Sequence, residues 1–211
     1  DDVLVSASDA ATGRTLVFVV PTQADSLRVE PLTLMGGQVA ARLHFDGVGV
    51  EDGLMVLGVD EGVVDEQLHR IANIATALLS LDLVGVGEAA LQRTVDYTTM
   101  RHQFGRPIAS FQAAQHLVAN MHIALSAARL AARAAVALLA EGDVATRATA
   151  VARMHSATAA KLATLDAHQL HGGMGYVVDT DLHRYSERAR VLSTLGGGAD
   201  IAATWLEGAT P

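Results

Sequence analysis

Residues 97–112 read YTTMRHQFGRPIASFQ and lie between two long segments of helical character. The stretch contains an arginine, a Gln-Phe-Gly run, a proline and a further glutamine, and its glycine and proline interrupt a helical pattern. A short loop between rigid helices is where binding residues accumulate, because the helices position the loop while it stays exposed to solvent. The stretch therefore predicts two helices joined by a binding loop.

On both sides of this loop, the spacing of apolar residues predicts helices. The first covers about residues 65–101 and is apolar nearly all round through its middle, so we expect it to be the most buried. The second begins after Phe111, and the third ends at Gly172 and Gly173, where glycine can take the left-handed conformation. A fourth begins near residue 179 or 181, breaks at residues 196–198 and resumes toward Trp205.

The second and third helices should pack antiparallel, since each carries one apolar stripe and the loop near residues 141–143 is short. The side chains expected to be buried between them are Leu117, Met121, Leu125, Met154, Leu162 and Leu165.

The first sixty residues have a different character, with short β-forming runs separated by turn-forming clusters. The runs cover residues 3–6, 15–20, 27–29 and 40–45. The predicted fold class is α+β, mainly α: a partial antiparallel β domain over residues 1–62, followed by an antiparallel four-helix bundle over residues 63–211. Because the chain begins almost inside a strand, we expect earlier strands of this sheet to be missing.

The composition excludes several classes of function. A net charge of −8 and a pI near 5.5 argue against nucleic acid as a partner, because nucleic-acid binding begins with a concentrated basic surface. The absence of cysteine excludes disulfides, thiolate metal sites and cysteine nucleophiles, and with no basic and apolar leader it favours the cytoplasm. Charged residues interrupt the apolar segments 72–91 and 123–139, so no membrane span is predicted.

A second motif, QLHGGMGY over residues 169–176, follows the first at a long interval. Together the two motifs resemble the acyl-CoA dehydrogenase family, whose patterns R-x-Q-F-G-x-P-I-x-x-F-Q and Q-x-x-G-G-x-G-Y occur in this order. The β segment, with VFVVP, LMGGQVAARLHFDGVGV and LMVLG, resembles the end of that family's middle domain. The resemblance covers essentially the whole chain.

The resemblance implies a bound FAD and an obligate oligomer, either homomeric or with a paralogous subunit. Arg101 would contact the FAD pyrophosphate of a neighbouring subunit, Gln103 and Phe104 would line the adenine end, and Gln112 would reach toward the cofactor. From the other side of the interface, Gln169, Gly172 and Gly173 would hold more of the dinucleotide. The implied partners are an acyl-CoA substrate and electron-transfer flavoprotein or a similar acceptor.

Simpler roles exist for some of these residues. Arg101 could be a cation in the last turn of a helix, where the helix dipole favours it. The glycines from Gly172 onward could serve only as a helix stop. His168 and His171 have a spacing compatible with a metal, but no third ligand falls beside them, so they are interpreted as structural and no metal site is predicted. Lys161 is expected to be a solvated charge.

The catalytic base of the family is the feature that this sequence lacks. Family members use a glutamate to remove the Cα proton of the acyl thioester, in most cases in an E-G-T-like turn. That turn is represented here by residues 195–198, and the base position is Gly196. The alternative family position falls near Ile74, which is not acidic either. We therefore predict no catalytic residue in this chain.

Two carboxylates are weak substitutes for that base. Asp200 is explained more simply as a carboxylate near the start of the last helix. Glu88 lies about 20 Å from Ile74 along the first helix. Three interpretations stay open: a catalytically silent subunit that completes FAD and acyl-CoA sites with a catalytic paralogue, a fragment of an active acyl-CoA dehydrogenase with an unconventional base, and a non-enzymatic structural or binding protein on this fold.

Overall fold

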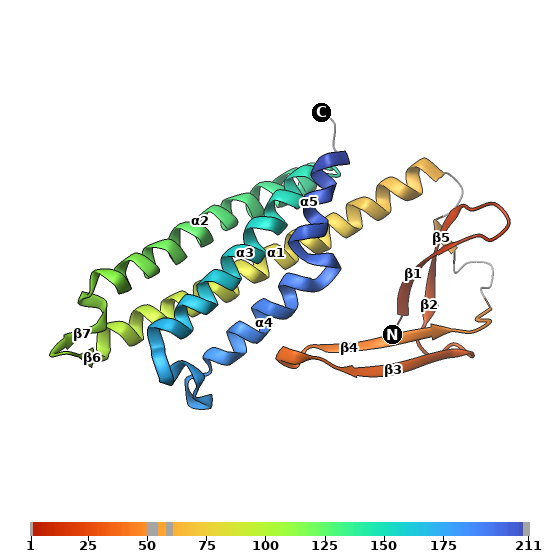
Figure 1. Ribbon diagram of the computed structural model, residues 1–211. Coiled ribbons are helices and arrows are strands. Elements are labelled where there is room, and N and C mark those ends of the chain that lie inside the picture. Colours follow the sequence, from red (N-terminus) through yellow and green to blue (C-terminus); the bar gives the residue numbers. More distant parts are fainter. Residues whose placement is uncertain (1, 50–54, 58–60, 209–211) are drawn as a thin grey trace. The chain divides into compact units, whose positions relative to one another are not determined.

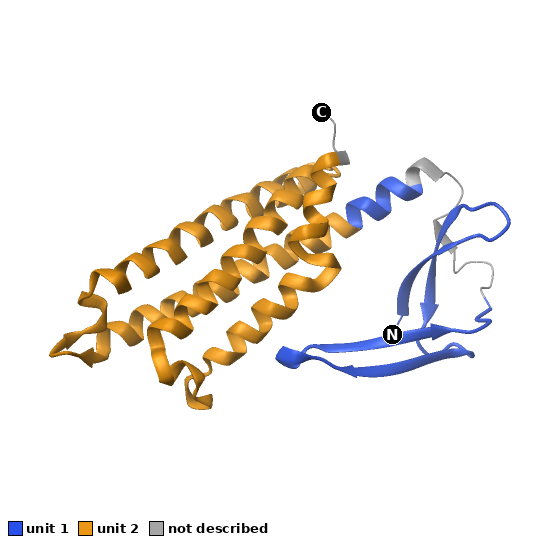
Figure 2. Ribbon diagram, viewed as in Figure 1, with its two compact units in different colours: residues 1–71 blue, residues 72–211 orange. Residues whose placement is uncertain are grey.

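The computed structural model describes residues 2–49, 55–57 and 61–208. Leu54 and Gly58, at the ends of the LMVLG segment, lie outside these residues. The chain divides into two compact units, residues 1–71 and 72–211 (Figure 2). Helix α1 (Glu61–Met100) is continuous across the division, so the first unit includes the N-terminal end of this helix as well as the strands.

The strands of the first unit are antiparallel, as predicted. Strands β1 (Asp2–Ser8), β2 (Thr15–Pro21) and β5 (Met55–Leu57) form a sheet in that order. Strands β3 (Leu27–Thr33) and β4 (Val39–Phe45) form a separate pair. Each of the four predicted runs lies within one of these strands, which confirms the β character of this region.

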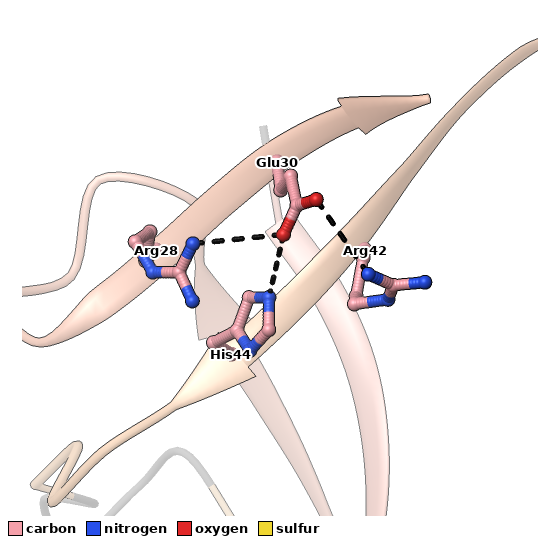
Figure 3. Close-up of polar contacts among 4 residues, drawn as sticks. All are labelled: Arg28, Glu30, Arg42 and His44. Atoms are coloured by element: carbon pink, nitrogen blue, oxygen red, sulfur yellow. Dashed lines mark hydrogen bonds and ion pairs between the residues drawn. The ribbon is translucent and has the colours of Figure 1, made fainter. Parts of the chain in front are cut away.

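A group of charged side chains links β3 and β4 on one face of the pair (Figure 3). Glu30 lies directly opposite Arg42, with 3.5 Å between their charged groups, and its other carboxylate oxygen lies 3.0 Å from Nε2 of His44. Arg28, two residues along the same strand, lies 3.6 Å from Glu30. Because these side chains are largely solvated, the pairs contribute to the register of β3 and β4 more than to stability.

The second unit is a helical bundle, in which α1 is joined by α2 (Gln112–Ala140), α3 (Thr146–His171), α4 (Leu182–Thr194) and α5 (Gly198–Gly208) (Figure 1). Short 3₁₀ turns connect these helices at Ile108–Ser110, Gly172–Tyr176, Val178–Thr180 and Leu195–Gly197. The predicted break in the fourth helical stretch separates α4 from α5. The α+β, mainly α fold class is confirmed.

Helices α2 and α3 pack against each other in antiparallel directions, as predicted, and a short loop joins them (Figure 1). Met121 and Leu125 of α2 are fully buried, and they share a cluster with Ala159 and Ala163 of α3. Alanines on α3 allow the neighbouring helix backbones to approach closely. At Gly87 of α1 a Cβ atom would lie 2.4 Å from the Leu125 side chain, so this glycine permits the contact between α1 and α2.

The predicted burial of the third helix is partly wrong. Leu162 and Leu165 are 37% and 59% exposed, and Leu117 and Met154 are half-buried. The reason is that α3 turns its small residues inward. The buried positions of α3 are mostly alanine, with Thr149, Arg153, Ser156 and Thr164 among them, whereas Leu162 and Leu165 face outward.

Helix α1 is also less buried than expected. Its side chains Ala77, Leu83 and Ala90 are fully buried, but Ile74 and Leu78 are 37% and 56% exposed. The apolar residues of α1 therefore lie on two different faces of the helix. One faces the bundle core, and the other is open in this chain.

Two helices, Val64–Met100 and Gln112–Ala140, are long and apolar enough to cross a membrane by length and composition. The central helices of a bundle meet the same criteria, because they are apolar where they face one another. Both helices contribute buried side chains to one core cluster, including Val84, Ala90, Met121 and Leu125. Part of their hydropathy is thus explained by the bundle, in which 39% and 28% of the two apolar windows are buried.

Candidate functional site

The predicted binding loop forms a small hairpin after α1. Strands β6 (His102–Gln103) and β7 (Arg106–Pro107) pair antiparallel, and Phe104 and Gly105 occupy the turn with φ of 54° and 79°. Positive φ at both central residues is the geometry of a tight turn that matches the twist of paired strands. The loop predicted between the two helices is therefore present, and it contains a two-residue turn at Phe104 and Gly105.

The hairpin presents its side chains outward. Phe104 is 93% exposed, and its ring meets that of Phe111 edge to face with centroids 6.3 Å apart. The guanidinium of Arg106 lies over the other ring, 4.0 Å from the centroid of Phe111. These contacts hold the turn against Phe111. The rest of the Phe104 ring is exposed and can stack on a planar ligand.

The C-terminal end of α3 forms the second part of the site. Gly172 has φ of 59°, which ends the helix, and a Cβ atom at Gly172 or Gly173 would meet open space. Gly175 is different, because its Cβ would lie 3.1 Å from the carbonyl oxygen of His168. Gly175 therefore serves packing, whereas Gly172 and Gly173 leave the backbone accessible.

The two motifs meet through Tyr97 and His171. Their rings stack with centroids 4.3 Å apart, and the Tyr97 hydroxyl donates to the His171 carbonyl oxygen at 3.4 Å. Since Tyr97 precedes the hairpin and His171 precedes the glycines, both motifs lie at the same end of the bundle (Figure 1). The predicted cofactor residues lie in these segments: Arg101, Gln103 and Phe104 in or beside the hairpin, Gln112 at the start of α2, and Gln169, Gly172 and Gly173 at the end of α3.

The polar side chains of this group have no internal partner. Arg101, Gln103, Gln112 and Gln169 are exposed, and none makes a side-chain hydrogen bond or ion pair within the described residues. A guanidinium and three amides with free donors suit an anionic ligand rich in hydrogen-bond acceptors. The donor set therefore fits the phosphates and adenine of a dinucleotide.

His168 and His171 are held by contacts inside the bundle. His168 Nε2 lies 3.0 Å from Oγ of Ser186, and its ring contacts Tyr176. His171 Nδ1 donates to the carbonyl oxygen of Ala167 at 2.7 Å. These contacts agree with the structural interpretation of both histidines, and they fix the end of α3 that carries the glycines.

Burial lowers the pKa of His171 below the ordinary value of 6.5, and the hydrogen bond to Ala167 opposes this shift. The unfolded chain therefore binds more protons at this residue than the folded chain does. The stability that depends on neutral His171 is complete above about pH 6.5 and is lost as the pH falls through the folded pKa. We expect the urea midpoint to fall on acidification below about pH 6.5.

His171→Phe should make this pH dependence shallower, because phenylalanine keeps a ring against Tyr97 but does not titrate. Urea unfolding at several pH values measures the effect. His155→Phe, at an exposed position on the same helix, is the control and should leave the slope unchanged. An equal slope in the parent and in His171→Phe contradicts the assignment.

The turn that corresponds to the family's base lies between α4 and α5. Gly196, Gly197 and Gly198 all have positive φ, of 64°, 88° and 71°. A Cβ at Gly197 would clash with Ile201, and one at Gly198 would lie 2.7 Å from the carbonyl oxygen of Ser193. Only Gly196 of the three has open space around its Cβ position, so the turn has room for a side chain there but holds none.

Other interactions account for the two carboxylates considered as substitutes for the base. Glu88 forms an ion pair with Arg129, with 3.0 Å between the charged groups. Asp200 lies exposed in the first turn of α5, where the helix dipole favours a carboxylate. Ile74 is partly exposed on α1. No carboxylate is therefore found at either predicted base position.

Sequence reasoning missed Arg153, which holds this turn in place. Its side chain is 2% exposed, and Nη2 donates to the carbonyl oxygens of Leu192 and Leu195 at 2.7 and 2.6 Å. Burial lowers the pKa of Arg153, and Nη1 has no hydrogen-bond partner among the described residues. The available signal was its register, since Arg153 falls in line with Thr149 and Ser156 on the buried face of α3.

Comparison with known proteins identifies the family. The family model described as "Acyl-CoA dehydrogenase, C-terminal domain" matches residues 67–206. The chain belongs to the acyl-CoA dehydrogenase family. It is 34% identical over 205 residues to a 3-sulfinopropanoyl-CoA desulfinase of Paraburkholderia xenovorans, covering 93% of this chain and 51% of the relative. Its identity to acyl-CoA dehydrogenase FadE28 of Mycobacterium tuberculosis is 31% over 198 residues, covering 94% of this chain and 55% of the relative.

Two solved structures share the fold of this chain over nearly its whole length. The ChsE4-ChsE5 complex from Mycobacterium tuberculosis matches with a TM-score of 0.88 and 29% identity, over 100% of this chain and 56% of that one. A steroid acyl-CoA dehydrogenase, the Tcur3481-Tcur3483 G363A variant, matches with a TM-score of 0.85 and 28% identity, over 98% and 54%. The chain thus spans about half the length of each of these relatives.

Proposed function

We propose that this chain is an FAD-binding subunit of an acyl-CoA dehydrogenase, which acts in α,β-dehydrogenation of an acyl-CoA thioester and lacks its own catalytic base. The observation that carries the proposal is the contrast between its two functional regions. The flavin-side residues are present and free at one end of the bundle, whereas the turn at Gly196 has space for a glutamate side chain and no carboxylate.

The flavin side is supported by the chemistry of its donors. Arg101 can bind two phosphate oxygens at once, and the exposed backbone at Gly172 and Gly173 allows a ligand to approach closely. When bound, FAD accepts the hydride that leaves Cβ of the acyl group. The residues of this chain bind and orient the cofactor, with Gln103, Gln112 and Gln169 supplying neutral hydrogen bonds.

The proton at Cα needs a base that this chain does not supply. We propose that a paralogous subunit carries the glutamate and that the two chains complete their sites together. Two structural relatives named as pairs, ChsE4-ChsE5 and Tcur3481-Tcur3483, are consistent with such an assembly. Electron-transfer flavoprotein or a similar acceptor, and a cytoplasmic location, belong to the same proposal.

The flavin assignment predicts a large effect at Arg101. Arg101→Ala should lower FAD affinity by about 10- to 150-fold, because a hydrogen bond to a charged partner contributes roughly 1.5–3 kcal/mol. Arg101→Lys should recover little, since an ammonium cannot reproduce the paired donors of a guanidinium. Flavin absorbance after gel filtration, in the presence of any natural partner, measures retention.

Arg147→Ala is the matched control, because Arg147 is an exposed arginine near the start of α3. It should retain flavin as the parent does. If Arg101→Ala also retains flavin fully, the cofactor role taken from the family does not apply to this chain.

A further inference from the structure

A pocket with a cavity volume of about 400 Å³ lies between α1 and α4, apart from the residues assigned to the flavin. Its α1 wall consists of Asp82, Gly85, Val86, Ala89 and Arg93. Its α4 side consists of Asp181, Arg184, Tyr185 and Arg188. Gly85, Val86 and Ala89 form a small apolar floor, and three arginines, two aspartates and a tyrosine surround it.

The three arginines differ in how they are paired. Arg188 binds Asp82 through two contacts, with Nη2 at 2.5 Å and Nε at 3.4 Å from the carboxylate oxygens. Arg184 lies 3.3 Å from Asp181. Arg93 contacts no carboxylate among the described residues: its Nε donates to the Tyr185 hydroxyl at 3.0 Å, and its guanidinium lies 5.2 Å from the centre of that ring.

The pocket consequently has an excess of one positive charge, and Arg93 is the cation that no carboxylate neutralises. Its remaining N–H donors suit a planar anion, which a guanidinium can bind through two parallel hydrogen bonds. Small residues at Gly85 and Ala89 leave space above the floor. Charge and shape together select a ligand that has an apolar body and a terminal carboxylate.

One face of α1 leads into this pocket. Ile74 and Leu78 are exposed, and the same face continues through Asp82, Gly85 and Ala89 to Arg93 at helical steps of three and four. Ile74 is the alternative position of the family's base, and Arg93 lies about 28 Å further along the axis. Helical side chains lean toward the N-terminus of their helix, and the reach of an arginine in that direction would shorten this span.

We propose that the α1–α4 pocket binds the distal carboxylate of a long dicarboxylic acyl thioester, with Arg93 as the specificity-determining residue. This inference rests on the proposed function. The thioester end would lie at the level of Ile74, and the acyl chain would run along α1 past Leu78, the Asp82–Arg188 ion pair and Ala89. The far carboxylate would reach Arg93 beside Tyr185. A chain of about sixteen carbons matches this span.

Equilibrium dialysis of the full chain tests the proposal without requiring turnover or bound flavin. The probes are hexadecanedioyl-CoA and hexadecanoyl-CoA, which differ only at the distal end. The parent should bind the dicarboxylic thioester at least about tenfold more tightly. Arg93→Gln should abolish the preference and leave affinity for hexadecanoyl-CoA unchanged. Arg133→Gln, at an exposed arginine on α2, should keep the preference.

A second pair of probes separates this inference from the proposed function. Hexadecanoate and hexadecanol carry no CoA and test the pocket itself. Equal affinity of the parent for the two thioesters overturns the inference. This holds even if hexadecanoate binds through Arg93, because the pocket would then bind a free carboxylate and not the distal carboxylate of a thioester. Failure of both thioesters to bind counts against the proposed function as well. An unchanged preference in Arg93→Gln also overturns the inference.

Discussion

Mixed anaerobically with acyl-CoA thioesters, the flavin-loaded chain alone is expected to stay oxidised. Gly196 has no side chain and Ile74 has no carboxylate, so neither position that the family uses for its base holds a group that could remove the Cα proton. A positioned general base contributes about 10²–10⁴-fold in rate. The chain should therefore bleach its flavin at least about a hundredfold more slowly alone than with a partner that supplies the glutamate.

The assay compares the chain alone with the chain co-expressed with its genomic neighbour, across a panel of acyl-CoAs. Rapid bleaching by the chain alone contradicts the proposal of a silent subunit. Asp200→Asn then tests the alternative that this exposed carboxylate has taken over the role of the base. Loss of bleaching in that variant would support an active enzyme with an unconventional base.

Gly196→Glu is an informative companion variant. The structure has open space at the Cβ position of Gly196. Its φ of 64° requires a left-handed residue, however, which costs about 1–2 kcal/mol for a side chain other than glycine. We expect the variant to fold with slightly lower stability. The matched variant Gly198→Glu should be far less stable, because its Cβ would lie 2.7 Å from the Ser193 carbonyl oxygen.

The second large effect is expected at Arg153. Arg153→Met should lower the free energy of unfolding by roughly 2–4 kcal/mol. The carbonyl oxygens of Leu192 and Leu195 would lose their donor, and removal of a desolvated charge offsets only part of this loss. Thermal unfolding should show a fall in Tm of roughly 5–15 °C.

Arg153→Lys distinguishes lost hydrogen bonds from lost volume. An ammonium donates in several directions and should recover part of the stability, whereas methionine recovers none of the hydrogen bonds. Arg190→Met, at an exposed position on α4, is the control and should change Tm little. An Arg153→Met variant with the Tm of the parent would show that the bonds to Leu192 and Leu195 do not hold the glycine turn.

Helix positions and the turn at Phe104 and Gly105 could be predicted from sequence because they depend on local preferences. Proline, glycine and the steps between apolar residues determine where a helix ends, and these are properties of neighbouring residues. Burial of individual side chains could not be predicted in the same way. Leu162 and Leu165 are apolar and correctly spaced, yet they face outward because α3 packs through its alanines.

The candidate site divides along the same line. Motif resemblance supplied the proposed flavin-side residues and the absence of a carboxylate at Gly196, since both depend on which residue occupies a position. The role of Arg153 and the pocket at Arg93 depend on residues from α3 and α4 or from α1 and α4, far apart in the sequence. Local sequence determined the helices, the strands and their motifs. The packing of the helices decided which charged side chains became buried, paired or free, because desolvation and ion pairing depend on distance in space.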